Sequence, residues 1–273
     1  MTRAAYNLSQ KFTKRRVLIT GAASGLGLAC AEILAREGWC LALTDADESR
    51  LDILVRKLRN HGAHVFAASC DVRDEATLCS VIDSIIVELG GVDLAIFCAG
   101  VVVAGPVHSS KAEDWRWAFD VNLHGLVNAT RAVIAHMAKG QGGMLINIAS
   151  AASFCTGANM SAYNASKAAV VAFSESMMQE YASYGVEVMV AMPGFFKTRL
   201  MEHARGNMKT LISARRLIEN SGISSEEVAE AMLKAAARGK RYFIFSNRYK
   251  YLWYLKRLLP SYFHNLLPLL LKR

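Results

Sequence analysis

The sequence predicts a single doubly wound α/β domain, in which helices cover both faces of a parallel sheet. Seven short apolar runs alternate along the chain with longer segments of helical periodicity. Strands joined through helices in this way form right-handed crossovers and a parallel sheet. The apolar runs do not alternate strictly with polar residues, which indicates strands that are buried on both faces.

The expected elements follow one another without a Pro-, Gly- or Ser-rich linker, so we expect one domain over residues 1–246 and a tail over residues 247–273. We predict strands at residues 17–20, 39–44, 63–67, 92–97, 144–148, 186–192 and 242–245. We predict helices at residues 26–37, 48–60, 75–89, 112–138, 162–184 and 226–238. Asn122 is unfavourable inside a helix, so we expect a kink in the long helix that contains it.

The composition is that of a globular protein with a large core. Of the 273 residues, 53% are hydrophobic and 20% charged, which excludes global disorder. The six cysteines form no C-x-x-C pair and no zinc-like spacing with histidine, so we expect no metal site and reduced thiols in a cytoplasmic protein. The N-terminus is basic without the apolar run of a signal peptide, and we interpret it as a short arm.

The net charge of +9 is concentrated near the C-terminus. Ten of the 32 basic residues follow Glu230, and no acidic residue does, so the rest of the chain holds 22 basic against 23 acidic residues. Nucleic-acid enzymes more often spread basic residues over a binding face. We therefore expect no nucleic-acid partner.

A glycine-rich turn joins the first predicted strand to the first predicted helix. Gly21, Gly25 and Gly27, with Ser24 and Leu26 between them, follow the pattern G-x-x-x-G-x-G. Glycines let the backbone turn tightly and approach a pyrophosphate, and a helix N-terminus adds free N–H groups and a favourable dipole. The alternative is a turn with a purely structural role.

An acidic residue ends the second predicted strand. Asp45 lies 18 residues after Gly27, where a dinucleotide-binding fold places the carboxylate that accepts the adenosine ribose hydroxyls. A carboxylate there repels a 2′-phosphate, which favours NAD over NADP. The alternative is an ordinary helix cap for the segment that starts at Asp47.

Two further short motifs follow predicted strands. Asp71 and Val72 come after the third strand and could contact the adenine, while Ala99 and Gly100 come after the fourth and let the backbone lie close to a cofactor. Each is weak alone. Together they mark the carboxyl ends of the strands, where such sheets bind ligands.

Tyr163 and Lys167 are four residues apart at the start of a predicted helix and share one face. An ammonium about 4 Å from a phenol is worth roughly 4 kcal/mol at an effective dielectric of 20. This would lower the tyrosine's pKa by about three units from its usual value near 10, making the pair a candidate general acid or base. Ser150 could hold the substrate oxygen beside the phenol, and Asn122 could help to hold a water near Lys167. Alternatively, the tyrosine and lysine form an ordinary surface pair.

These residues resemble the short-chain dehydrogenase/reductase family over about residues 13–246. The resemblance implies a Rossmann-like fold and at least a dimer formed through the two long helices. It implies that Tyr163 transfers the proton and that Lys167 lowers its pKa and binds the nicotinamide ribose. It also implies that Ser150 polarises the substrate oxygen and that Asn122 supports a proton relay. The motifs that carry it are residues 20–27, Asp45, Asp71-Val72, Ala99-Gly100, Asn122, Ser150, Tyr163-x-x-x-Lys167 and Pro193-Gly194.

The family likeness extends to a loop that covers the nicotinamide, formed by Pro193, Gly194 and Phe196, with Thr198 near the carboxamide. One departure is plain. The family usually has two asparagines after the fourth strand, where this chain has Phe97 and Cys98. The missing amides would weaken a contact within the sheet or to the adenine, but the catalytic positions are complete.

Two C-terminal segments are expected to meet the substrate. Residues 199–223 correspond to the family's substrate lid, and their apolar side chains indicate an apolar substrate or a lid packed on its own domain.

The tail over residues 247–273 is too broken by prolines and charges to span a membrane. Basic residues oppose an apolar helical face, which favours a membrane surface; contact with a second subunit or cover over the pocket is the alternative. The predicted face comprises Tyr251, Leu252, Leu255, Leu258 and Leu259, with Lys250 and Arg257 opposite, although Arg248 falls on the apolar side at the first turn.

Together these features predict an NAD-dependent oxidoreductase that moves a hydride between nicotinamide and a hydroxyl- or carbonyl-bearing carbon of a lipid-like substrate. The substrate would be a secondary alcohol or ketone, or an alcohol or aldehyde, and the enzyme cytoplasmic and membrane-associated. One alternative is a reductase of 3-oxoacyl thioesters on a carrier protein, against which Asp45 argues because biosynthetic reductases usually prefer NADPH. The other is a non-catalytic NAD sensor or scaffold.

Overall fold

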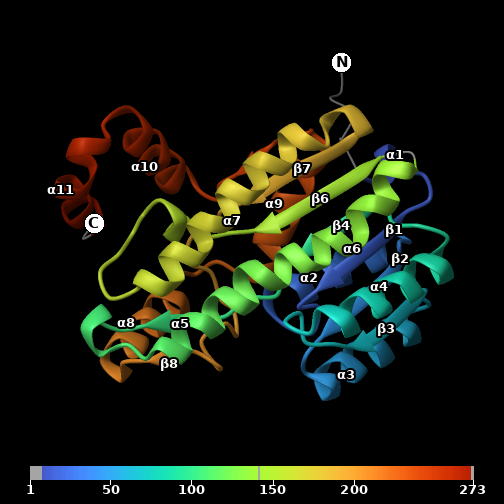
Figure 1. Ribbon diagram of the computed structural model, residues 1–273, viewed down its shortest axis with the longest axis horizontal. Helices are drawn as coiled ribbons and strands as arrows, with labels where there is room; N and C mark the ends of the chain where they lie inside the picture. Colours follow the sequence, from blue (N-terminus) through green and yellow to red (C-terminus); the bar gives the residue numbers. More distant parts are fainter. Residues whose placement is uncertain (1–7, 141, 272–273) are drawn as a thin grey trace.

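Seven parallel strands form the central sheet of the structure, a computed structural model that describes residues 8–140 and 142–271. The strand order is β3-β2-β1-β4-β6-β7-β9, so the chain winds outward in both directions from β1. Helices cover both faces of the sheet (Figure 1), which confirms the predicted doubly wound fold. The strands are β1 Arg16–Thr20, β2 Cys40–Asp45, β3 Val65–Ser69, β4 Leu94–Phe97, β6 Gly143–Ile148, β7 Val186–Ala191 and β9 Tyr242–Phe243.

Successive residues of β1, β2, β4, β6 and β7 enter two hydrophobic clusters, one on each face of the sheet. Val17 and Ile19 lie in the first cluster with α2, α3 and α9, whereas Leu18 lies in the second with α4, α6 and α7. Because both faces are buried there, these strands are apolar throughout, whereas the edge strand β3 buries only Val65. The helices are α2 Gly25–Arg36, α3 Glu48–Asn60, α4 Glu75–Leu89, α6 Gly125–Lys139, α7 Ser161–Glu180 and α9 Ser225–Ala237.

The long helix predicted over residues 112–138 is interrupted where a kink was expected. It consists of α5 Ala112–Phe119, a π-helical segment Asp120–His124 and then α6. Asn122 is buried inside the π-helical segment. Such segments often occur at functional sites, and this one turns the amide of Asn122 towards the end of β4.

Some elements differ from the predicted pattern. The third strand begins at Val65 rather than residue 63, because Ala63 donates its N–H to Leu58 and so completes the C-terminal turn of α3. Two-residue strands β5 Val103–Ala104 and β8 Arg205–Gly206 pair in parallel, and α8 Met208–Glu219 follows them. Elements of two residues have no periodicity to recognise. Within the expected N-terminal arm, Leu8–Lys11 form the short helix α1, and residues 1–7 lie outside the described part of the chain.

The tail forms two helices, α10 Asn247–Leu258 and α11 Pro260–Leu271, at the left side of the view in Figure 1, far from α3 and β3. Its predicted single apolar face is divided. Leu252 is 2% exposed and packs into the second cluster, as does Phe263, while Tyr251 and Leu258 are 64% and 77% exposed. The division arises because α10 packs against the domain through only part of that face. Across residues 8–140 and 142–271, no helix is long and apolar enough to cross a bilayer.

Candidate active site

The glycine-rich turn after β1 packs directly against the end of β4. Gly21 has a φ of +64°, and a Cβ placed on it would lie 2.6 Å from the backbone nitrogen of Ala99. A Cβ on Gly27 would collide with the carbonyl oxygen of Gly21. Any side chain at either position would therefore force the turn open, so both glycines are required by close backbone contacts.

The N-terminus of α2 faces the space that this turn encloses. Gly25 begins the helix, and within the described residues the side chain of Ser24 at the N-cap makes no capping hydrogen bond. The first-turn N–H groups, including that of Leu26, thus remain available to an anion. A Cβ on Gly25 would lie 2.7 Å from the Oγ1 atom of Thr198, so Thr198 closes the turn from the other side. Gly21, Gly25, Gly27 and the first turn of α2 thus form a glycine cradle that fits a dinucleotide pyrophosphate.

Asp45, at the end of β2, is held in a fixed orientation beside the cradle. Its carboxylate accepts hydrogen bonds from the backbone N–H groups of Ala23 and Asp47 at 2.9 and 3.0 Å. The helix cap of α3 is Asp47, whose side chain accepts from the N–H of Arg50. Asp45 is therefore not the N-cap of α3, and its remaining lone pairs can accept hydrogen bonds from hydroxyl groups.

Asp71 and Val72 follow β3 as expected, but the Asp71 side chain is already engaged. Its carboxylate binds the guanidinium of Arg73 at 2.5 Å, and this bond holds the pKa of Asp71 below its usual value. Val72 is buried, and its carbonyl accepts from the side-chain amide of Asn128 at 3.4 Å. A contact with adenine from this segment would therefore come from the backbone more readily than from the carboxylate.

Ser150 and Tyr163 come together at the carboxyl end of the sheet. Ser150 follows β6, and its hydroxyl accepts from the N–H of Ala152 at 3.1 Å. Tyr163 lies in the first turn of α7 with its ring buried, and its phenol lies beside the Ser150 side chain. Burial raises the pKa of Tyr163, whereas the neighbouring Ser150 hydroxyl lowers it by a smaller amount.

Lys167 is near the tyrosine but does not depress its pKa as the spacing predicted. The Nζ atom lies 6.0 Å from the centre of the Tyr163 ring and donates to the carbonyl oxygen of Ile148 at 2.9 Å. Burial lowers the pKa of Lys167 to about 8, so the amine itself loses part of its charge near that pH. The expected lowering of the Tyr163 pKa was wrong, because burial dominates at the phenol and the Lys167 amine bonds to the Ile148 carbonyl instead.

Asn122 joins the π-helical segment to the loop after β4 and to α7. Its Oδ1 accepts from the N–H of Val101 at 2.8 Å, and its Nδ2 donates to the Val101 carbonyl at 3.0 Å and to Ser166 at 2.9 Å. Ser166 in turn donates to the carbonyl of Tyr163 at 2.9 Å. Both amide protons are used, so a water near Lys167 would need the neighbouring backbone or the second Oδ1 lone pair.

Two contacts in this network were not predicted, that of Ser166 with Asn122 and that of Gly100 with Asn122 and Lys167. The signal that could have identified Ser166 is a small polar residue directly before Lys167. Gly100 brings the site together, since a Cβ there would lie 3.3 Å from both the Asn122 Oδ1 and the Lys167 Nζ. The four expected catalytic side chains and the end of β4 therefore occupy one edge of the sheet.

The 193–198 loop connects the catalytic turn to the glycine cradle. The carbonyl of Pro193 accepts from the N–H of Ala151 at 2.8 Å, next to Ser150. Phe196 packs against the first hydrophobic cluster, and Thr198 reaches Gly25 at the far end of the loop. The loop thus lies between the two places where a nicotinamide and a pyrophosphate are expected. Gly194, between them, lies against the ring of Tyr249 from α10.

An apolar cluster surrounds the side of Tyr163 that the lid covers. Tyr163 shares this cluster with Val102 and Ala104 from the segment after β4, and with Met201 and Ile218 from the lid. All five side chains are buried. Leu200 and Leu211 pack against the cluster from the lid. The environment available to a substrate beside the phenol is therefore largely apolar.

The departure at Phe97 and Cys98 changes the local packing. Phe97 is buried in the second cluster and lies in register with Asn147 of β6, whose Oδ1 is buried and has no hydrogen-bond partner in the described part of the chain. Phenylalanine cannot donate to it, as an amide side chain could. Cys98 lies against Cys30, and their hydrogen bond together with burial raises the pKa of the Cys30 thiol. All six cysteines are free.

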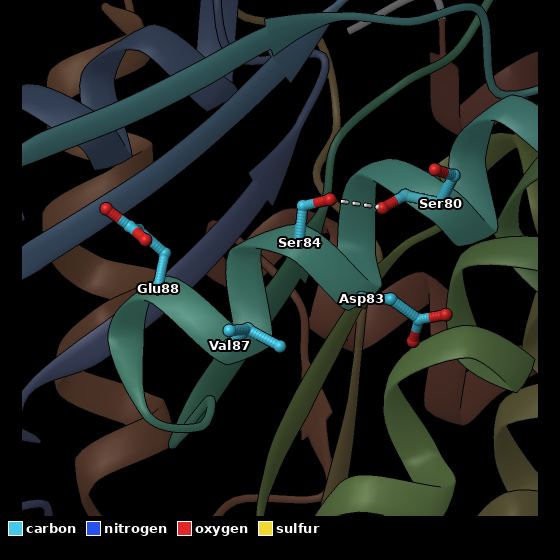
Figure 2. Close-up of a pocket in the computed structure, with 5 residues that line it drawn as sticks. All are labelled: Ser80, Asp83, Ser84, Val87 and Glu88. Atoms are coloured by element: carbon cyan, nitrogen blue, oxygen red, sulfur yellow. Dashed lines mark hydrogen bonds between the residues drawn. The ribbon is translucent and has the colours of Figure 1, made fainter.

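The surface depression on α4 shown in Figure 2 lies apart from this site. Ser84 donates its hydroxyl to the carbonyl of Ser80 at 2.9 Å, a bond within the helix, and Val87 is exposed. The remaining lining residues, Asp83 and Glu88, are also on the outer side of α4. None of the predicted site residues lines this depression. The candidate active site is defined instead by the glycine cradle and Tyr163.

Known proteins share this architecture. A family model described as short chain dehydrogenase matches residues 15–209. The chain is 30% identical over 226 residues to cis-4-hydroxycyclohexanecarboxylate dehydrogenase of Sinomonas cyclohexanicum, covering 82% of this chain and 90% of that enzyme. It is 36% identical over 180 residues to 2,3-dihydro-2,3-dihydroxybenzoate dehydrogenase of Bacillus subtilis strain 168, covering 66% and 69%.

A solved structure agrees with these sequence relatives. A short-chain dehydrogenase/reductase from Burkholderia phymatum, in complex with NAD, matches with a TM-score of 0.84 and 28% identity, covering 89% of this chain and 93% of that one. The family predicted from the motifs is therefore confirmed. This chain belongs to the short-chain dehydrogenases/reductases, oxidoreductases that act on CH–OH groups.

Proposed function

We propose that the protein is an NAD-dependent oxidoreductase that interconverts a hydrophobic, lipid-like secondary alcohol and its ketone, or an alcohol and its aldehyde. The proposal rests on the position of Tyr163, whose hydroxyl contacts Ser150 while its ring lies among apolar side chains of the lid. An apolar substrate can bury there without leaving a charge unpaired, whereas a charged one would lose its hydration without a partner.

The four polar side chains divide the proton chemistry between them. Tyr163 exchanges a proton with the substrate oxygen, and Ser150 holds that oxygen in place. The raised pKa of Tyr163 keeps the phenol protonated at neutral pH, the form that donates to a carbonyl oxygen. Lys167 holds the nicotinamide ribose, and Asn122 fixes the backbone around it and supports the proton relay. NAD, when bound, supplies the hydride acceptor or, once reduced, the donor.

The choice of NAD follows from Asp45 and the cradle beside it. The carboxylate is fixed by two backbone N–H groups and can accept the adenosine ribose hydroxyls. It would repel a 2′-phosphate at the same place. Gly21, Gly25, Gly27 and the 193–198 loop enclose the rest of the cofactor.

Steady-state assays test the function directly. Purified enzyme is given NAD or NADP with a series of uncharged secondary alcohols of increasing length and with hydroxy acids of matched length. We expect turnover with NAD, and kcat/KM rising about fourfold for each added CH₂ that the lid buries. Preference for the hydroxy acids would contradict the proposal. Binding of NAD without turnover of any alcohol or ketone would favour the sensor or scaffold alternative.

The tail supports a second part of the proposal, docking on an anionic membrane surface. Tyr251, Tyr254 and Leu258 of α10 are exposed, as is Lys250 on the same helix. Aromatic and leucine side chains beside unopposed basic residues are typical of interfacial helices. A surface of this kind would let the enzyme take a lipid-like substrate directly from the bilayer.

Vesicle flotation tests this docking. The full chain is mixed with vesicles of phosphatidylcholine alone or with added phosphatidylserine, and compared with a Tyr254→Ser/Leu258→Ser variant. We expect flotation with the anionic vesicles and a clear loss in the variant. Val87→Ser, which changes an exposed apolar residue on α4, is the control and should float like the wild type. Equal flotation of all three proteins, or of none, would contradict docking through the tail.

We also propose that the protein is a cytoplasmic homo-oligomer, at least a dimer, assembled through the long helices α6 and α7. The support is the family resemblance. Sedimentation at several protein concentrations tests it, and a monomer at all of them would refute it.

A further inference from the structure

The first turn of α10 contacts the loop that is expected to cover the nicotinamide. The Tyr249 ring lies on Gly194 so closely that a Cβ there would collide with the ring's Cε2 atom. The neighbouring Phe195 backbone lowers the pKa of Tyr249, while burial raises it more strongly. The ring also packs against the second hydrophobic cluster. Tyr249 therefore contacts Gly194 through its ring, and its hydroxyl lies beside the Phe195 backbone.

Gly194 is required by this ring rather than by its own backbone. Its φ is outside the left-handed range that favours glycine, unlike that of Gly21 or Gly25. The three atoms that a Cβ at position 194 would meet first all belong to Tyr249. A residue 55 positions later in the sequence thus determines what position 194 can hold.

The contact lies at the centre of a loop that is attached at both ends to the candidate site. At one end, the Pro193 carbonyl accepts from Ala151, the neighbour of Ser150. At the other, the Thr198 hydroxyl closes the cradle at Gly25. Between these attachments, Gly194 and Phe195 rest on Tyr249. A movement of the tyrosine would therefore reach both the catalytic turn and the pyrophosphate cradle.

The helix that carries Tyr249 is itself fixed to the domain. Leu252 is buried in the second cluster. Arg257 lies 3.3 Å from the carboxylate of Glu175 on α7 and stacks over Trp253 at 4.2 Å. Because Leu252 and Arg257 anchor α10 to the domain, Tyr249 in its first turn is held at a defined place.

We propose that Tyr249 is a positioning residue, which holds Gly194 and Phe195 so that the 193–198 loop closes over the nicotinamide. The C-terminal helices thereby complete the active site of the same subunit. The proposal rests on the proposed function only in assigning that loop to the cofactor. It also gives the tail a role within the domain, in addition to any role at a membrane.

Variants of the full chain test this positioning. Tyr249→Ala removes the ring and Tyr249→Phe only the hydroxyl, while Tyr262→Ala changes an exposed tyrosine on the neighbouring helix α11 and is the matched control. We expect about 100-fold lower kcat/KM and weaker NAD binding in Tyr249→Ala, because small displacements of reacting groups are costly. Tyr249→Phe, which removes the polar contact with the Phe195 backbone, should lose about fivefold. Tyr262→Ala should match the wild type.

Hydrogen exchange of the 193–198 loop, measured without cofactor, is a readout that general destabilisation would not reproduce. We expect faster exchange confined to this loop and its neighbours in Tyr249→Ala, and at the Phe195 amide in Tyr249→Phe. If Tyr249→Ala does not fold, the phenylalanine variant still decides the question. The proposal would be overturned if Tyr249→Phe left both the exchange and the kinetic constants unchanged, and if Tyr249→Ala either failed to fold or lost no more activity than Tyr262→Ala.

A double-mutant cycle adds an independent check. Gly194→Ala should impair NAD binding and turnover because its methyl group collides with the ring. Adding Tyr249→Ala removes the collision, so the double variant should bind NAD better than Gly194→Ala alone, and the effects should be non-additive. Additive losses would overturn the proposal.

The exchange measurement also separates this proposal from the function proposed above. If the wild type turns over no alcohol or ketone but the loop responds to the Tyr249 variants, the enzymatic function fails and the positioning role stands. If turnover is found but the loop does not respond, the positioning role fails alone.

Discussion

The glycine cradle and the substrate lid border the same site, but they are built in different ways. In the cradle, a single methyl group on Gly21 or Gly27 would collide with backbone atoms less than 3 Å away. In the lid, α8 buries only Ile218, while Met208 is 68% exposed and Ile212 also faces solvent. One region is determined by backbone contacts that accept a single residue type. The other is made of apolar side chains that others of similar size could replace.

This difference indicates which part of the site determines chemistry and which determines substrate. The cradle, Asp45 and the Tyr163 segment position groups through short hydrogen bonds and tight turns, as proton and hydride transfer require. In the function proposed above, the lid contributes apolar area, which would select substrates by size and hydrophobicity with small energies per group. Changes in the first region should therefore be severe and independent of substrate size, whereas changes in the second should be mild and depend on it.

Tyr163→Phe should have the largest effect. Removing the hydroxyl deletes the general acid or base, so we expect kcat/KM to fall by about 10²–10⁴-fold for every alcohol tested. NAD binding should remain close to that of the wild type, since the ring still fills its place in the buried cluster. Steady-state kinetics and a cofactor titration measure the two quantities. A loss that varied strongly with substrate size would break the distinction between the two regions.

Lys167→Met should change the pH dependence of stability. Burial lowers the pKa of Lys167 from 10.5 to about 8, so between these values the unfolded chain binds a proton that the folded chain does not. The free energy of unfolding contributed by this group therefore rises with pH across that window, by at most about 3 kcal/mol. Urea unfolding at pH 8 and pH 10 measures it.

The quantity to compare is the free energy of unfolding of the wild type minus that of Lys167→Met, because the contributions of other titrating groups cancel in this difference. We expect this difference to become more favourable to the wild type as the pH rises. A difference that stayed constant would show that the amine is better hydrated than its burial indicates.

Much of the cradle and catalytic segment was predictable because their signals are local. Gly21, Gly25 and Gly27 lie within one turn, and Tyr163 and Lys167 within one helical turn. The direction in which the Lys167 amine points was not predictable, because the spacing only places Tyr163 and Lys167 on one face of a helix. The amine bonds to the carbonyl of Ile148, 19 residues away in the sequence. The raised pKa of Tyr163 was not predictable either, because it arises from burial of the phenol.

The lid and tail were harder for a related reason. The apolar side chains of α8 mostly face solvent, so their pattern does not mark a buried face. The tail pattern predicted an amphipathic helix correctly but not that Leu252 would pack inward while Tyr251 faced out. The contact of Tyr249 with Gly194 joins residues far apart in sequence, and no local rule connects them.

Asp45→Ala should sharpen the assignment of the cradle to NAD. Hydrogen bonds to a charged group are worth about 2 kcal/mol, so we expect NAD binding to weaken by roughly 30-fold and NADP binding much less. Asp47→Ala is the matched control, because it removes the α3 cap and costs about 1 kcal/mol of stability without touching the ribose site. Calorimetric titration of both cofactors gives the ratio. Equal losses for NAD and NADP would refute the role of Asp45.

Ile218→Ala should give the smallest effect and the one most dependent on substrate. Ile218 is the lid residue of α8 that is buried beside Tyr163, so shortening it opens space for a bulkier alcohol. We expect the ratio of kcat/KM for a branched alcohol over its linear isomer to rise by roughly fivefold, about 1 kcal/mol. Ile212→Ala, on the exposed side of the same helix, should leave that ratio unchanged. If both variants altered kcat equally for all substrates, the lid would be acting on the chemistry rather than on substrate choice, and its contrast with the cradle would not hold.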